Sequence, residues 1–252
     1  MLTPPITTAL ILAAGLGSRL QTMWSHAPKG LLPVGATSLL ERSLEQLLRC
    51  GIAKVVLVTG HQADQFTPLV ERYPCIQTVY NPFYATSGSM YSLYCARALV
   101  SGPFLLLEAD LLYEDRALHA LLANPDESAL LVSGFTGSGD EVYVDAVGGR
   151  VNGLSKHRER LAAVSGEMVG ITKVAPRLFQ RMVAYAETIF AQTLQLEYCS
   201  GCLNAVAATG ELASCTVEDL LWAEIDDAAQ WRRVQETLFP RLLAAHAEQA
   251  AR

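Results

Sequence analysis

The stretch TTALILAAGLGSRL, residues 7–20, decides the fold expected of this chain. It begins with a continuous apolar run, which is typical of a buried β-strand, and it ends in two glycines, a serine and an arginine. Glycines leave backbone N–H groups accessible, and cations such as Arg19 attract oxyanions. A second cation, Lys29, follows nine residues after Leu20. The stretch therefore predicts a strand that leads into a phosphate-binding turn.

The segments that follow repeat the order strand, helix, strand. TSLLERSLEQLLRCG (residues 37–51) has leucines at helical spacing, a Thr/Ser start and a glycine stop, and AKVVLVTG (53–60) reads as another buried strand. Further strands are predicted within 76–81, 103–110 and 128–135, and helices within 89–100 and 115–125. Apolar strands that alternate with helices predict an α/β sandwich, with a mostly parallel sheet covered on both faces.

The second half of the chain changes character. Residues 134–165 are rich in glycine and polar residues and contain β-like fragments, which predict hairpins over the sheet's edge. After 166–175 the chain is predicted to be mainly helical, except around 211–226. No linker divides it, so we expect one domain over 1–252, with an acceptor-binding insertion of hairpins at about 134–170. The amphipathic C-terminus is predicted to pack either on the domain or on a second copy of the chain, and the second alternative would make the protein a homodimer.

Composition argues against several classes of partner. The formal net charge is −6 and the pI about 5.4, so we expect neither nucleic acid nor membrane binding, and a phosphate site must be built locally. No apolar run approaches membrane-spanning length, and the N-terminus lacks a signal-peptide pattern, which predicts a cytoplasmic protein. The six cysteines are scattered and several lie in apolar segments, so they are expected to be reduced core thiols. The Cys199/Cys202 pair has no second ligand pair that would make it a zinc site.

Acidic residues follow two of the strand-like segments. Ligands of an open parallel sheet bind beyond the carboxyl ends of its strands, and Asp110 comes directly after such a strand. The alternative for Asp110 is an N-cap or turn aspartate for the following helix. Asp226 lies in EIDD (224–227), at the end of another β-like segment. If both carboxylates reach one crevice, they are suited to hold Mg²⁺ or another divalent cation.

The glycine turn departs from the dinucleotide-binding fingerprint. The third glycine of G-x-G-x-x-G is missing, and Pro28 and Lys29 stand near the place of the ribose-binding acid. A nicotinamide- or flavin-dependent oxidoreductase therefore leaves Lys29 unexplained. A catalytically silent nucleotide-binding module would be expected to have lost Arg19, Lys29, Asp110 or Asp226, and all four are present.

The segment LAAGLGSRLQTMWSHAPKGLLPV (12–34), with LLERSLEQL and VVLVTGH after it, resembles the signature of nucleotidyltransferases that join a nucleoside triphosphate to a phosphorylated small molecule. This resemblance implies a Rossmann-like three-layer sandwich with a mixed, mostly parallel central sheet. It implies that Arg19 and Lys29 neutralise the α-phosphate and the departing pyrophosphate. It also implies that Asp110 and Asp226 are the metal ligands.

Later segments narrow the resemblance. They are similar to the cytidylyltransferases that activate phosphocholine and 2-aminoethylphosphonate, more closely to the phosphonate branch, over roughly residues 8–243. These segments are 81–97, 105–114, 140–144, 153–156, 166–171 and 219–227. The resemblance makes CTP the expected nucleotide and CMP-aminoethylphosphonate the expected product. The alternatives are a phosphocholine cytidylyltransferase and a sugar-1-phosphate nucleotidyltransferase, whose sugar-binding elements are poorly matched.

The resemblance also gives roles to single residues. The nucleotide is expected to contact Leu12, Ala13, Ala14, Gly15, Gly17, Ser18, His61, Gly88, Ser89 and Glu108, with His26 as a further candidate. Lys156 is expected to join Arg19 and Lys29 in catalysis by binding the acceptor's phosphonate, and its alternative is a solvated loop. The acceptor's ammonium is expected to meet Asp140, Glu141 or Glu167. Small molecules are thus the expected partners.

Overall fold

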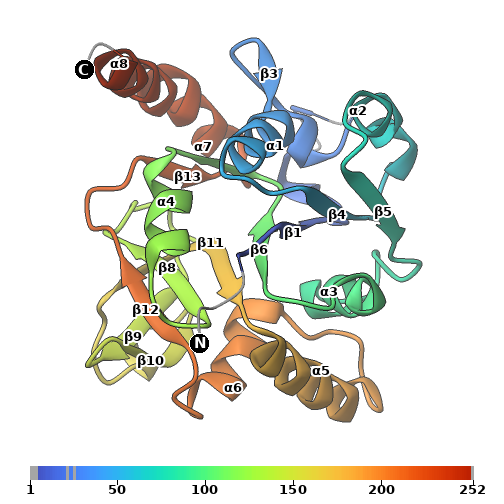
Figure 1. Cartoon of the computed structure of the whole chain (residues 1–252), viewed down its shortest axis with the longest axis vertical. Helices are drawn as coiled ribbons and strands as arrows, with labels where there is room; N and C mark the ends of the chain where they lie inside the picture. Colours follow the sequence, from blue (N-terminus) through green and yellow to red (C-terminus); the bar gives the residue numbers. More distant parts are fainter. Residues whose placement is uncertain (1–4, 21–22, 25–26, 251–252) are drawn as a thin grey trace.

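The centre of the molecule is a nine-stranded sheet in the order β5-β4-β1-β6-β11-β8-β12-β10-β9 (Figure 1). The computed structural model describes residues 5–20, 23–24 and 27–250. The strands are β1 (Thr8–Ala13), β4 (Lys54–Thr59), β5 (Ile76–Tyr80), β6 (Phe104–Glu108), β8 (Ala129–Ser133), β9 (Tyr143–Val147), β10 (Arg150–Ser155), β11 (Gly166–Val174) and β12 (Ala213–Thr216). β10 and β11 run opposite to the other strands of this sheet, so it is mixed and mostly parallel, as predicted.

Helices cover both faces of the sheet and complete the three layers of the predicted Rossmann-like sandwich (Figure 1). One face carries α1 (Leu39–Arg49), α2 (Thr67–Arg72) and α4 (Arg116–Ala123), and the other carries α3 (Ser89–Cys95), α5 (Pro176–Phe190) and α6 (Asn204–Ala207). The last helices are α7 (Ala228–Arg233) and α8 (Phe239–Ala250). None of the helices in the described part of the chain is long and apolar enough to cross a membrane.

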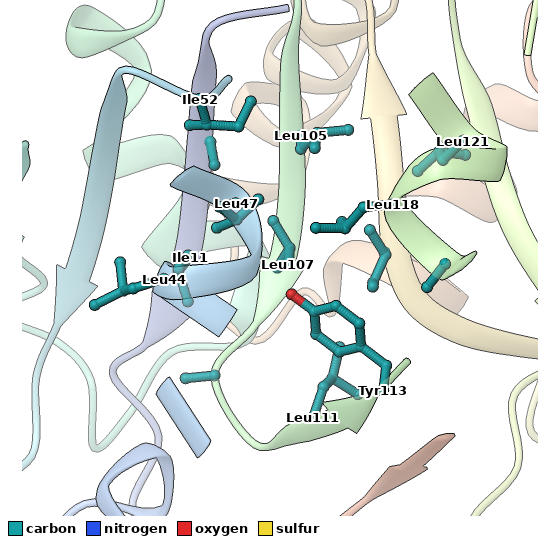
Figure 2. Packing of buried hydrophobic residues seen from close by; sticks show 14 of the residues in the cluster. Ile11, Leu44, Leu47, Ile52, Leu105, Leu107, Leu111, Tyr113, Leu118 and Leu121 are labelled. Carbon is teal, nitrogen blue, oxygen red and sulfur yellow. The ribbon is translucent and has the colours of Figure 1, made fainter. Parts of the chain in front are cut away.

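Helix α1 shows why the sequence signals hold. Its N-cap is Ser38, whose hydroxyl accepts a hydrogen bond from the backbone N–H of Glu41 at 3.2 Å. Leu44 and Leu47 then point toward the sheet and are buried against Ile11 and its neighbours (Figure 2). The predicted start and the buried leucine face are both confirmed.

A two-stranded ribbon lies beyond the end of β6 and places residues 222–225 beside residues 110–113. β7 (Leu111–Tyr113) pairs antiparallel with β13 (Trp222–Glu224), and the N–H of Ile225 donates to the carbonyl of Asp110 at 3.1 Å. A second ribbon joins β2 (Pro33–Val34) to β3 (Thr37–Ser38). The segment from α7 to α8 buries apolar side chains against these ribbons, so this part of the C-terminus packs on the domain.

The region after β8 differs from the prediction in one respect. β9 and β10 form a hairpin through the two-residue turn Gly148–Gly149, with φ of +59° and +76°, but this hairpin extends the central sheet and does not lie over its edge. The reason is the length of β11, which pairs with β6 only over Ile171–Val174. Its first residues, Gly166 and Glu167, extend beyond that pairing and pair with β9, while Glu167 also pairs with Ser133 of β8. Pairing satisfies backbone groups that an open edge would leave free.

Candidate functional site

The ends of β1, β4 and β6 lie side by side at one edge of the sheet. The first glycine turn and the end of β6 line a cleft of about 410 Å³ there. Of the residues predicted to bind the nucleotide or its phosphates, those lining the cleft are Leu12, Ala13, Ala14, Gly15, Lys29, Gly88, Ser89, Glu108 and Asp110. The crevice expected beyond the parallel strands is therefore present.

Lys29 lies between the two aspartates predicted as metal ligands. Its Nζ is 2.5 Å from Oδ2 of Asp110 and 2.5 Å from Oδ1 of Asp226, so these two oxygens are at most twice that distance apart. All three side chains are largely buried, with exposed fractions of 18%, 13% and 8%. Burial by itself lowers the pKa of Lys29, but the two carboxylates outweigh it and raise that pKa above its ordinary value.

The local structure explains how these groups meet. Asp110 stands in the turn between β6 and β7. The N-cap alternative for it is wrong, because α4 begins only at Arg116, whereas the turn position is observed. The pairing of β7 with β13 then brings Asp226 to the same place. The stem of Lys29 lies against the first turn, where a Cβ on Gly17 would come within 2.9 Å of the lysine Cγ.

The ion pairs continue from Asp226 to the predicted acceptor residues. Arg19 bridges two acids, with 3.0 Å to Oδ2 of Asp226 and 2.7 Å to Oδ2 of Asp140. Lys156 binds the other oxygen of Asp140 at 2.6 Å. Three cations predicted from segments far apart in sequence thus alternate with acids along one path. We call Asp110–Lys29–Asp226–Arg19–Asp140–Lys156 the ion-pair chain.

The sequence analysis missed Glu224. Carboxylate oxygens of Glu108, Asp110 and Glu224 lie within 4.8 Å of one another. Burial, and then the neighbouring charge of Asp110, raises the pKa of Glu108 to about 8, and burial with the charges of Glu108 and Asp110 raises that of Glu224. The signal was a repeated acid-x-acid pattern, since 108 and 110 match 224 and 226, each at a strand end.

These residues fit a divalent cation. Their donors are all carboxylate oxygens, the ligand type that Mg²⁺ prefers. Oδ1 of Asp110 is also buried with no hydrogen-bond partner, so it has lone pairs free for a metal ion.

The far wall of the cleft depends on Gly88. Its N–H donates to the carbonyl of Leu194 at 2.8 Å, and a Cβ at this position would lie 2.4 Å from the carbonyl oxygen of Leu196. The adjacent Ser89 hydroxyl donates to Glu197 at 2.5 Å. Glu197 lines the cleft, and nothing in the sequence had indicated it.

Some predicted residues lie beside the cleft. The N–H of His61 donates to the carbonyl of Ala14 at 3.3 Å and its ring faces Tyr84, but it is not among the lining residues. Gly17 and Ser18 belong to the same turn, also outside the lining set. His26 falls outside the described residues, so its predicted place in the cleft is untested.

The acids of the predicted acceptor region divide into two groups. Asp140 and Glu167 border a small hollow together with Glu224 and Asp226. Glu167 accepts from the N–H and hydroxyl of Thr136 at 2.7 and 3.0 Å, yet burial raises its pKa to about 7. Glu141 is only partly buried and is not among the residues that border this hollow.

Cys199 and Cys202 behave as core residues. Both are buried and free, and burial raises the pKa of each thiol to about 12. A thiol that keeps its proton is a poor metal ligand and a poor nucleophile, as expected for the interior role.

Comparison with known proteins adds independent evidence. Residues 9–202 match the MobA-like NTP transferase domain. The 2-aminoethylphosphonate cytidylyltransferase of Lancefieldella rimae is 30% identical over 89% of this chain and 90% of its own. The choline-phosphate cytidylyltransferase of Streptococcus pneumoniae is 36% identical, over 39% of this chain and 42% of its own.

A solved structure has the same fold across almost the whole length. The inositol-1-phosphate CTP transferase from T. maritima superposes with a TM-score of 0.81 at 20% identity, over 96% of this chain and 98% of that one. The resemblance in sequence, the matched domain and the arrangement of strands agree. The chain therefore belongs to the MobA-like NTP transferase family and is a nucleotidyltransferase.

Proposed function

We propose that this chain transfers CMP from CTP to 2-aminoethylphosphonate and releases pyrophosphate. The observation that carries the proposal is the ion-pair chain, which starts from Lys29 in the cleft and connects it through acids to Arg19 and Lys156. A relative 30% identical over most of both chains is a 2-aminoethylphosphonate cytidylyltransferase, which supports this choice of substrates. Both substrates are small metabolites of the cell interior, so we place the reaction in the cytoplasm.

The reaction needs charge neutralisation more than proton transfer. A phosphonate resembles a phosphoryl group, whose second pKa is about 6, so a large share is already a dianion at neutral pH. The barrier is then the repulsion between this dianion and the triphosphate. Arg19 and Lys29 reduce this repulsion at the nucleotide, and Lys156 reduces it at the acceptor. Electrostatic interactions in a partly buried site are stronger than the same interactions in water.

Each end of the nucleotide has a proposed place. We assign the triphosphate to the first turn, whose residues Leu12 to Gly15 line the cleft and whose Gly17 and Ser18 lie beside it, and the base to Gly88 and Ser89. Asp110 and Asp226 are the proposed metal ligands, with Glu108 and Glu224 close by. A divalent ion held there would supply positive charge to the triphosphate.

The residues near the proposed acceptor site favour the primary ammonium of aminoethylphosphonate over the quaternary ammonium of phosphocholine. A quaternary ammonium cannot donate hydrogen bonds and favours aromatic faces, whereas a primary ammonium favours acids. The hollow bordered by Asp140 and Glu167 has four carboxylates, one cation (Arg233) and, among its described lining residues, no aromatic ring, so acids predominate there. The insertion at 134–170 is therefore proposed as the acceptor-binding part of a single domain.

Pyrophosphate release tests the proposal directly. Each of the four common nucleoside triphosphates is paired with aminoethylphosphonate, phosphocholine, phosphoethanolamine and a sugar 1-phosphate, in the presence of Mg²⁺. We expect CTP with aminoethylphosphonate to give the highest kcat/KM. A higher value with phosphocholine or a sugar phosphate would replace the proposed acceptor, and a preference for another nucleotide would refute the CTP assignment.

The same proposal requires direct in-line attack on the α-phosphorus. An α-phosphorothioate nucleotide of known chirality should give product with inverted configuration. Retention, or isolation of a nucleotidyl-enzyme, would show that a covalent intermediate intervenes.

A further inference from the structure

The ammonium of Lys29 fills the space between the two proposed metal ligands. Its Nζ is 2.5 Å from an oxygen of Asp110 and 2.5 Å from an oxygen of Asp226, and the side chain is 18% exposed. Its stem is held by the first turn, since the Cβ position of Gly17 lies 2.9 Å from the lysine Cγ. The lysine is thus placed by the fold and does not reach this position from open solvent.

A single ammonium does not satisfy the group of acids around it. Asp110 uses Oδ2 for Lys29 and leaves Oδ1 buried without a hydrogen-bond partner. Carboxylate oxygens of Glu108 and Glu224 lie within 4.8 Å of those of Asp110. A divalent cation has a higher charge than an ammonium and binds more oxygen ligands, so it would satisfy more of these carboxylates than Lys29 does.

We propose that Lys29 takes, in the metal-free enzyme, the position of the divalent cation, so that the ion and the Lys29–carboxylate pairs exclude each other. This inference rests on the proposed function for the assignment of Asp110 and Asp226 as metal ligands. When the ion arrives, the displaced ammonium needs an anion, and the triphosphate entering beside Gly15 and Gly17 supplies one. Metal and nucleotide therefore bind with positive coupling, while the ion alone binds weakly.

The first experiment measures metal binding without nucleotide. Mn²⁺ is titrated into the full-length protein, and free Mn²⁺ is followed by electron paramagnetic resonance. Lys29→Met keeps a side chain of similar length but removes the competing charge, so its affinity for Mn²⁺ should rise about tenfold or more. An affinity equal to or below that of the wild type would overturn the proposal.

Lys156→Met is the matched control. Lys156 belongs to the same ion-pair chain but contacts Asp140 and neither of the proposed ligands. It loses the same charge without vacating the space, so its Mn²⁺ affinity should stay within about threefold of the wild type. If both variants gain the same affinity for Mn²⁺, the cause is the change in overall charge, and the proposal that the ion displaces Lys29 is refuted.

A second measurement keeps the proposal testable if Lys29→Met does not fold. The chain has four lysines, Lys29, Lys54, Lys156 and Lys173, so a lysine-selective ¹³Cε NMR spectrum of the wild type is simple to assign by replacing the other three with arginine. Mg²⁺ without nucleotide should shift the Lys29 signal and leave that of Lys54 in place. Saturation with Mg²⁺ while the Lys29 signal stays unchanged would overturn the proposal.

These outcomes are separate from the fate of the proposed function. Both titrations lack nucleotide and acceptor, so they report on Lys29 whichever substrates the enzyme uses. A failure of pyrophosphate release with CTP would reject the proposed reaction, and it would leave the metal affinities of the two variants to decide the displacement.

Discussion

At the residue scale, the site is governed by the partners of each charge. Lys156 is half-exposed and shares Asp140 with Arg19, so its ammonium is held by an ion pair and does not extend freely into solvent. Glu167 is buried and hydrogen-bonded to Thr136, and its pKa is raised in spite of those donors. Each of these two residues gives a prediction.

Lys156→Ala should damage use of the acceptor far more than binding of CTP. The ammonium is proposed to bind the phosphonate, so kcat/KM for aminoethylphosphonate should fall about 100-fold, while the Kd for CTP changes by less than about threefold. Steady-state kinetics and a calorimetric titration with CTP measure the two effects. Equal losses in both would assign Lys156 to the nucleotide.

Glu167 should make the folded state less stable as the pH rises. Its pKa is about 7 in the folded chain against an ordinary value of 4.5, so the folded state holds the proton over a range where the unfolded state has released it. This contribution is fully present below about pH 4.5 and is lost as the pH rises through about 7.

Urea unfolding of wild type and Glu167→Gln between pH 4.5 and 8 measures this effect. The difference in unfolding free energy between the two should change across that range, and the wild type should show the steeper decline, because the glutamine does not titrate. Parallel curves would mean that Glu167 does not hold a proton in the folded state.

At the scale of elements, short pairings position the cleft. The turn before α3 is tied to residues 194–198 by the N–H of Gly88, and β7 is tied to β13. Strands β1, β4 and β6 and helices α1 and α4 were predicted from apolar runs and caps, which are local signals. The pairing of 86–90 with 194–198 left no local signal, because it depends on close approach of two backbones.

Gly88→Ala should therefore damage both stability and the cleft. The new methyl group would lie 2.4 Å from the carbonyl oxygen of Leu196, so the wall must shift. We expect a loss of about 2 kcal/mol in unfolding free energy, as for overpacked interiors, and weaker CTP binding.

The matched control is Gly102→Ala, since nothing lies within 4 Å of a Cβ at that position. It should change the unfolding free energy by less than about 0.5 kcal/mol, as expected for a surface substitution. Equal stability of the two variants in urea would show that the contact at Leu196 is not restrictive.

At the scale of the whole molecule, the fold was more predictable than the site. Alternating strands and helices gave the sandwich, and the exit of β6 pointed to Asp110. The meeting of Asp110 with Asp226 could be stated only as a condition, because it is made by the β7–β13 ribbon, whose strands are three residues each and far apart in sequence. The placement of the hairpin β9–β10 could not be predicted either, because it depends on how far β11 extends to pair with β9.

The central claim is that Asp226 and the amino-terminal cations act on the same phosphorus atom. Its most direct test is ³¹P NMR of CTP, aminoethylphosphonate and Mg²⁺ with wild type and Asp226→Asn at equal concentration. The account predicts a phosphonate–phosphate anhydride and pyrophosphate with the wild type, and at least about a 100-fold slower appearance with the variant, which keeps its shape but loses its charge. Product formation by Asp226→Asn at the wild-type rate would contradict it.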